Sequence, residues 1–355
     1  MRLRALGGTG IKVSPFCLGT MMFGPWGGTT YEDAAPVIHR ALDSGVNFVD
    51  TADVYGGGAC EEIVGRALKG VRDDVVLAGK VHYPMGEDAN TWGNSRRWIT
   101  RAVEDSLRRL GTDHLDLYQV HRPDPHTDID ETLGVLSDLV RSGKIRAAGS
   151  STFPAEQIVE AQWVAERRGH VRLRTEQPPY SILNRSAETA VLPTCARYGM
   201  GVMTWSPLSE GWLTGRFQGE IDLTRGRQAA HRRNFDPALP GNVRKREAVT
   251  ELTKLAEDAG LSLVHMSIAF AAAHPQVTSV ILGARTMEQM EDLLAATGTT
   301  LDDALLDRID EIVPPGTVLN PADSHYRPPA MRDARLRRRG HHIEPLVETP
   351  GPATS

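Results

Sequence analysis

Short apolar runs alternate along this chain with longer segments in which apolar residues recur every three or four positions. The short runs, such as VVLAGK at residues 75–80, predict buried strands. The longer segments, such as the one that carries Ile99, Val103 and Leu107, predict helices that pack by one face. Several helices are expected to stop at a glycine, as at Gly111 and Gly143. A strand–helix unit therefore repeats about eight times along the chain.

The expected elements begin with a small hairpin at residues 1–14, in which GGTG forms the turn. Strands are expected at residues 15–20, 46–50, 75–80, 115–121, 145–151, 171–177, 201–206 and 279–283. Helices are expected at residues 32–44, 61–68, before Gly111, before Gly143, at 154–168 and at 187–198. A Gly- and Arg-rich segment at 207–244 precedes a seventh helix, and two short helices follow the last strand.

This order of elements bears directly on the fold class. Strands that alternate with helices pair in parallel and are joined by right-handed crossovers. About eight units favour a (β/α)8 TIM barrel with an N-terminal β-hairpin and extra C-terminal helices over an open doubly wound sheet. The open sheet usually carries a dinucleotide fingerprint after its first strand, and GTGIKV lacks the third glycine. We expect a single barrel domain at residues 1–320 and a Pro- and Arg-rich tail at 321–355.

Composition narrows the class of protein further. Of 355 residues, 40% are hydrophobic and 24% are charged, as in globular proteins with a sizeable core. No apolar run approaches the roughly 20 residues of a membrane helix, and the N-terminus does not resemble a secretory signal. Three cysteines without paired spacing favour a reducing, cytoplasmic location. The net charge of -5 does not suggest nucleic acid, and the arginines at 332–339 indicate a solvated tail or a partner contact.

Four titratable residues stand at or just beyond successive strand ends. Asp50 ends one predicted strand, and Tyr55 follows five residues later, before three glycines. Lys80 ends the next strand and His121 the one after. Each has an ordinary structural reading, such as a turn cap for Asp50 or a core histidine for His121. In a barrel, however, the carboxyl ends of all strands meet at one mouth, so the joint placement predicts an active site.

These four residues also carry a family resemblance. The chain resembles the aldo-keto reductase family, in its bacterial and channel β-subunit-like branch, over about residues 1–320. Asp50 and Tyr55 lie in NFVDTADVYG, Lys80 in VVLAGKV and His121 in DLYQVHRPDP. Further matches are GSSTFPAEQI, EQPPYSILNR, WSPLSEGWLTGR and SVILGARTMEQ. The resemblance implies an NADPH-dependent enzyme that transfers a hydride between nicotinamide and an aldehyde or ketone carbonyl.

The family's chemistry implies a role for each of the four residues. Tyr55 would donate the proton that the developing alkoxide needs. Lys80, as an ammonium about 4 Å away, would lower the pKa of the phenol by at most about three units, and desolvation would oppose it. Asp50 would hold Lys80 charged and in place. His121 would orient and polarise the carbonyl.

The resemblance also implies how a nicotinamide would be held. Trp205 would stack on its ring, and Ser151 and Gln177 would hold its carboxamide. Thr152 stands where many members carry an asparagine, a difference that weakens one expected hydrogen bond. Leu293 stands where many members place an adenine-binding asparagine, so adenine recognition is expected to be looser.

Selectivity for NADPH would depend on Arg285, the implied partner of the 2′-phosphate, through a contact worth ~1.5–3 kcal/mol. A solvated arginine at the start of a helix is the alternative reading. The full implied cofactor set is Gly19, Thr20, Met21, Asp50, Ser151, Thr152, Gln177, Trp205, Ser206, Pro207, Leu208, Arg216, Gly283, Arg285, Gln289 and Asp292.

Other protein classes fit the sequence less well. Potassium-channel β subunits bind nicotinamide for regulation, but many lack a histidine at the position of His121. A metal-dependent barrel hydrolase needs clustered ligands, which His121 with His126, or His341 with His342, do not provide, so no metal is expected. A short-chain dehydrogenase would need Tyr and Lys four residues apart, a spacing that no Tyr has here.

The expected partner is a small carbonyl compound rather than a membrane or nucleic acid, and the sequence is compatible with a homo-oligomer. Phe23, Trp26, Tyr83 and Arg122 are expected to shape a mostly apolar pocket. Such a pocket favours aldehydes or ketones with hydrophobic bodies.

Overall fold

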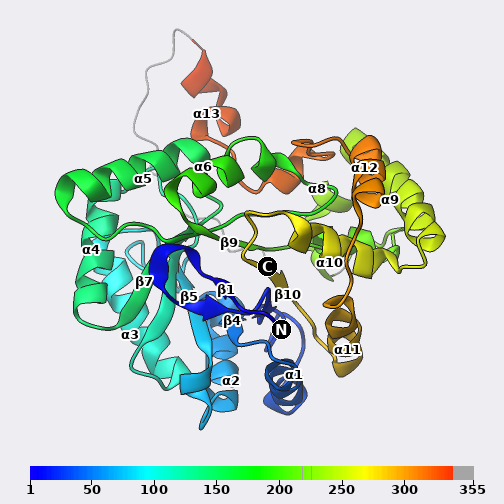
Figure 1. Cartoon of the computed structure of the whole chain (residues 1–355). Helices are drawn as coiled ribbons and strands as arrows, with labels where there is room; N and C mark the ends of the chain where they lie inside the picture. Colours follow the sequence, from blue (N-terminus) through cyan, green and yellow to red (C-terminus); the bar gives the residue numbers. More distant parts are fainter. Residues whose placement is uncertain (218, 225, 339–355) are drawn as a thin grey trace.

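A closed barrel of parallel strands organises the chain, as the repeated strand–helix pattern predicts (Figure 1). The computed structural model describes residues 1–217, 219–224 and 226–338. The strands follow one another around the barrel in chain order, and β10 pairs with both β9 and β3 to close it. The barrel strands are β3 (Phe16–Gly19), β4 (Phe48–Asp50), β5 (Val76–Val81), β6 (Leu115–Val120), β7 (Ile145–Ser151), β8 (Thr175–Gln177), β9 (Gly201–Thr204) and β10 (Ser279–Leu282).

The helices form a ring outside the strands (Figure 1). Their ends follow from local chemistry: Thr30 and Asp33 form a capping box at the start of α1, and Gly111 ends α3 in the left-handed conformation. Within the described residues no single helix is long and apolar enough to cross a membrane, although α9 and α10 together, bent by 94°, meet that test. The helices are α1 (Tyr31–Asp43), α2 (Ala59–Ala67), α3 (Arg96–Leu110), α4 (Ile129–Arg141), α5 (Ala155–Arg168), α6 (Val191–Tyr198), α7 (Gly226–Ala230), α8 (Arg232–Phe235), α9 (Pro240–Asp258), α10 (Leu263–Ala273), α11 (Met287–Ala296), α12 (Asp303–Ile312) and α13 (Pro329–Arg332).

Three elements differ from the pattern-based expectation. The strand expected at 171–177 is regular only over its last three residues, as β8. The helix expected at 187–198 begins at Val191, because an earlier start would place Pro193 where it breaks an internal hydrogen bond. The segment at 207–244 contains two short helices and the start of α9, which Pro240 opens at a position that suits its fixed φ.

The N-terminal hairpin closes one end of the barrel. Its strands β1 (Arg4–Ala5) and β2 (Lys12–Val13) pair antiparallel on either side of the turn η1 (Gly7–Thr9). Leu6 and Val13 are fully buried and pack with barrel residues such as Phe48 and Met203. The hairpin lies at the amino ends of the strands, since the main chain of Gly7 approaches that of Gly201, the first residue of β9. The carboxyl ends are therefore the open mouth.

The first part of the expected tail packs against the barrel. In η6 (Pro321–Ser324), the buried Asp323 accepts a hydrogen bond from Lys245 of α9 at 3.0 Å. Asn320 donates to Asn242 at 2.7 Å, and Asn184 donates to the carbonyl of Asp323 at 2.7 Å. The expected boundary at residue 320 thus falls inside a packed segment. Residues 339–355 of the expected tail lie outside the described residues.

Gly65 sets how closely α2 approaches α3. A Cβ atom at this position would lie 2.3 Å from the carbonyl oxygen of Leu110. We predict that Gly65→Ala lowers the free energy of unfolding by ~1–3 kcal/mol through overpacking, although alanine is the better helix former. Urea unfolding measures this. Gly298→Ala, whose Cβ meets no atom within 4 Å, is the control. Equal midpoints for the two variants would contradict the explanation.

Candidate active site

The four titratable residues lie together at the carboxyl ends of three neighbouring strands. Asp50 is the last residue of β4, and Tyr55 begins the turn η2 (Tyr55–Gly58) after it. Lys80 lies near the end of β5, and His121 directly follows β6. All four side chains are buried. We call these four residues the tetrad.

Lys80 is the centre of the tetrad. Its Nζ donates to Asp50 Oδ2 at 2.6 Å, to the carbonyl of Thr51 at 2.9 Å and to the Tyr55 hydroxyl at 3.1 Å. All three protons of the ammonium therefore have partners. Because the Tyr55 oxygen accepts from Lys80, its own proton is directed elsewhere and is available to a ligand.

The electrostatics of Tyr55 differ from the sequence-based expectation. Burial is the largest influence and raises the pKa of Tyr55, while the Lys80 ammonium lowers it by less and Asp50 raises it again. The net direction is upward, because Lys80 and Asp50 form a nearly neutral pair and have little combined field at the phenol. For Lys80, burial by itself lowers the pKa, but Asp50 and Tyr55 together raise it above its usual value. Lys80 thus favours the phenolate form of Tyr55, but by less than burial disfavours it.

His121 is held as a neutral imidazole. Burial lowers its pKa well below the usual value, and the charges of Arg122 and Lys80 lower it further. Its ring lies 6.0 Å from that of Tyr55, centroid to centroid. Within the described residues its Nδ1 has no hydrogen-bond partner. A neutral ring beside the Tyr55 hydroxyl can orient a polar group without adding charge.

Aromatic side chains and one arginine surround the tetrad. The ring centroids of Trp26 and Tyr55 are 5.9 Å apart, and those of Tyr83 and His121 are 4.9 Å apart. Arg122 lies over Tyr83, with its Cζ 5.6 Å from the ring centroid. These three expected pocket residues therefore flank the tetrad. Phe23 differs, because it is fully buried and packs in the core between strands and helices.

Main-chain strain marks the loops where cofactor contacts are expected. Thr152, directly after β7, has φ +59°, a conformation that a β-branched residue rarely adopts. After β9, Ser206, Ser209 and Glu210 have φ values of +58°, +48° and +56°. Such outliers persist only where the surroundings enforce them, and they concentrate at ligand sites. Asparagine tolerates this region better than threonine, so the main chain at Thr152 is held there by its surroundings and not by the preference of the residue.

The other expected cofactor residues occupy the same end of the barrel. Gly19, Thr20 and Met21 end or follow β3, and the Thr20 hydroxyl donates to the carbonyl of Asp50 at 2.9 Å. The Ser151 hydroxyl donates to the carbonyl of Gln177 at 2.9 Å. Ser206, Pro207 and Leu208 follow β9; Gly283 and Arg285 follow β10; Gln289 and Asp292 lie on α11.

Two residues of α11 make contacts within the protein. The side chain of Gln289 accepts from the backbone N–H of Arg285 at 2.9 Å. Asp292 accepts from His265 of α10 at 2.9 Å. Arg285 itself is exposed, and within the described residues no carboxylate pairs with it. Arg285 is thus the free cation of this group.

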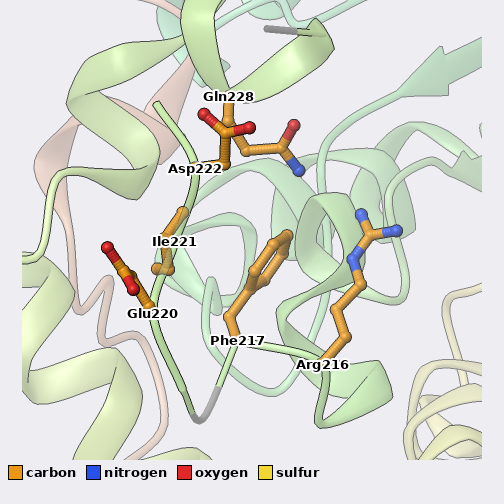
Figure 2. A pocket seen from close by; sticks show the side chains of 6 residues that line it. All are labelled: Arg216, Phe217, Glu220, Ile221, Asp222 and Gln228. Carbon is orange, nitrogen blue, oxygen red and sulfur yellow. The ribbon is translucent and has the colours of Figure 1, made fainter. Parts of the chain in front are cut away.

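Arg216 lies at a separate cavity of about 230 Å³ (Figure 2). The cavity is lined by Arg216 and Phe217, by residues 220–222 and by Gln228, and no member of the tetrad reaches it. Phe217 packs on the buried Trp212, with ring centroids 5.4 Å apart. Glu220 and Asp222 bring negative charge to the same space, so this cavity by itself is a poor fit for a pyrophosphate.

Two residues of the site, Gln119 and His325, were missed from the sequence, and the contact of the expected Gln177 with Asp50 was not foreseen. Gln119 and Gln177 both donate to Asp50 Oδ1, at 3.3 and 2.9 Å. Gln119 lies two residues before His121, and the alternation of a strand points both inward, a signal that was available. His325 packs edge-on against Trp205 at 4.5 Å, centroid to centroid. No pattern in the irregular segment after residue 320 indicates that contact.

A buried acidic pair supports the loop that carries Tyr55. Asp53 and Glu61 are fully buried, and Arg109 of α3 donates to Glu61 at 2.7 Å. Burial raises the pKa of both carboxyls, and the charge of Arg109 offsets this only in part. One oxygen of each has no partner within the described residues. The pair therefore belongs to the scaffold behind the tetrad.

Comparisons with known proteins agree with this geometry. A model of the aldo/keto reductase family matches residues 15–314. An uncharacterized oxidoreductase of Bacillus subtilis, YrpG, is 38% identical over 88% of this chain and 96% of its own length. The aldo-keto reductase YhdN of the same organism is 36% identical over 94% and 99% of the two chains. A probable voltage-gated potassium channel subunit beta of Arabidopsis thaliana is 34% identical over 88% of this chain and 97% of its own length.

Glu176 beside the site generates a test by pH. Its oxygens accept from the Phe153 N–H and the Ser150 hydroxyl, and burial, opposed by these bonds, raises its pKa to about 7. A folded-state pKa above the unfolded value gives stability that is present below about pH 4.5 and is lost as pH rises through 7. We predict that the free energy of unfolding of the wild type falls by an amount on the order of 3 kcal/mol between pH 5 and 8. Glu176→Gln, which mimics the protonated carboxyl, should not show this decrease.

Urea unfolding at several pH values measures the difference between wild type and Glu176→Gln. Substitution of the exposed Glu257 by glutamine is the control, for which the profile of the wild type should be retained. A constant difference between wild type and Glu176→Gln across this pH range would show that Glu176 is ionised in the folded protein.

Proposed function

The chain belongs to the aldo/keto reductase family, and we propose that it is an NADP(H)-dependent reductase of aldehydes or ketones. Its relatives support an oxidoreductase as the general class. The observation that carries the finer proposal is the bridge made by Lys80 Nζ between Asp50 and the Tyr55 hydroxyl. That bridge holds a phenolic proton at the barrel mouth beside a neutral imidazole.

The residues at the mouth fit a nicotinamide dinucleotide. The strained turn at Ser206–Glu210 and the strained Thr152 are features that ligand sites commonly have. Gly283 leaves open space where any other residue would place a Cβ atom. Trp205, Ser151 and Gln177 would hold the nicotinamide, and the turn after β9 with Gly283 and Arg285 would hold the phosphates and adenosine. When bound, the cofactor supplies or accepts the hydride.

Tyr55 then supplies the proton. Its raised pKa keeps the phenol protonated at neutral pH, and an alkoxide that develops on the substrate is a much stronger base than a phenolate. Lys80 stabilises the phenolate left behind, since its ammonium already contacts that oxygen. Asp50 keeps Lys80 charged, and His121 orients the carbonyl with a hydrogen bond. General acid catalysis of this kind contributes ~10²–10⁴ in rate.

A purely regulatory barrel is not favoured. One relative is named a potassium channel subunit beta, but others are named oxidoreductase and aldo-keto reductase. This chain also keeps His121 beside Tyr55. A cytoplasmic, reducing setting is part of the proposal, because Cys17, Cys60 and Cys195 are buried and unpaired.

Removal of one oxygen tests the role of Tyr55. We predict that Tyr55→Phe lowers kcat for carbonyl reduction by ~10²–10⁴-fold, because no other group holds a proton in that place. The dissociation constant for NADPH, measured by fluorescence titration, should change little. Tyr83→Phe, which also removes a phenol near His121, should keep the activity. A parallel loss of NADPH binding and activity in Tyr55→Phe would argue against its role as the acid.

Arg285 tests the coenzyme preference. We predict that Arg285→Ala weakens NADPH binding by ~10–100-fold and leaves NADH binding nearly unchanged, because only NADPH carries the 2′-phosphate. Dissociation constants for both coenzymes measure this. If both weaken equally, Arg285 does not contact that phosphate.

A further inference from the structure

Arg122 places a positive charge at the mouth of the tetrad. It directly follows His121 and is partly buried. Its Cζ lies 5.6 Å from the ring centroid of Tyr83 and 5.6 Å from that of Trp205, and its Nη1 donates to the carbonyl of His121 at 2.6 Å. The ring of Tyr83 therefore contacts both the Arg122 guanidinium and the His121 imidazole.

No carboxylate forms an ion pair with this guanidinium within the described residues. Asp50 pairs with Lys80. Asp124, two residues on, accepts hydrogen bonds from the Asn94 and His126 N–H groups and the Thr127 hydroxyl. Glu176 is fully buried and accepts hydrogen bonds from Ser150 and Phe153, and the charge of Arg122 lowers its pKa less than these bonds do. Every nearby acid thus has other partners.

The three histidines around Arg122 carry no charge of their own. His82, His121 and His325 all face it, and burial lowers the pKa of each, with the charge of Arg122 as a further cause. These three imidazoles are neutral at physiological pH. Lys80 is balanced by Asp50. Arg122 is therefore a charged group at the mouth that has no ion-pair partner within the described residues.

A partly dehydrated guanidinium over aromatic faces gains only a modest cation–π attraction, and within the described residues Arg122 makes a side-chain hydrogen bond only to the carbonyl of His121. A carboxylate matches its planar donors in a bidentate arrangement. We propose that the substrate carries an anionic group, best a carboxylate, that Arg122 binds while the carbonyl lies at Tyr55 and His121. The inference rests on the proposed reductase function and names the class of its substrate as an oxo acid.

A matched pair of substrates tests this. The two probes are 4-carboxybenzaldehyde and its neutral methyl ester, each reduced with NADPH by wild type, Arg122→Met and Arg122→Lys. Each change is read as the ratio of kcat/KM for acid to ester, because differences in intrinsic carbonyl reactivity cancel when enzymes are compared. We expect Arg122→Met to lower the ratio by ~10–100-fold, mainly through KM of the acid, and Arg122→Lys to restore part of it.

The possible outcomes separate this inference from the proposed function. If the wild type reduces the ester well and the ratio is the same in all three enzymes, the inference is wrong and the reductase function stands. A loss confined to KM for NADPH assigns Arg122 to the cofactor and also overturns the inference. If the wild type reduces neither probe nor any other aldehyde, the proposed function fails, and the inference with it. If Arg122→Met does not fold, the ratio in Arg122→Lys against wild type decides.

Discussion

The site depends on a buried ammonium that must be fully paired. Lys80 has no exposed side-chain surface, and removing such a charge from water costs several kcal/mol unless each of its protons is bonded. Asp50, the carbonyl of Thr51 and the Tyr55 hydroxyl meet that demand together. The demand holds the end of β4, the turn after it and the end of β5 in one arrangement. The position of the Tyr55 hydroxyl thus follows from the need of the Lys80 ammonium for a third hydrogen-bond acceptor.

The barrel makes this arrangement rigid. In the parallel register Asp50 lies opposite Ala78, and Lys80 lies opposite Gln119, so neighbouring strands present polar side chains at successive levels of the mouth. The hairpin fills the other end, where Leu6 and Val13 complete the apolar interior. Gln119 and Gln177 then occupy the second oxygen of Asp50, which orients its first oxygen toward Lys80. The scaffold therefore fixes the orientation of the Asp50 carboxylate as well as its distance from Lys80.

Burial governs the charges at this mouth more than any single neighbour does. It raises the pKa of Tyr55 and of Glu176 and lowers that of His121. Tyr55 and His121 are therefore neutral near pH 7, whereas Glu176, with a pKa of about 7, is partly ionised there. Lys80 lowers the pKa of Tyr55, as expected, but burial and the charge of Asp50 outweigh it, so the net shift is upward rather than downward. Arg122 is charged and forms no ion pair within the described residues. The neutral Tyr55 and His121 and this cation therefore have separate places in the same mouth.

The sequence alone determined the barrel, its hairpin and the position of the tetrad, because strand and helix periods are local and chemistry in parallel barrels collects at strand ends. Asp50, Tyr55, Lys80 and His121 could be placed from their strands without coordinates. Tertiary structure decided the rest. The contact of His325 with Trp205 joins residues far apart in the chain through an irregular segment, which no periodic pattern predicts. The direction of the Tyr55 pKa depends on how completely water is excluded and on how charges balance, and both are properties of the packed molecule rather than of any segment.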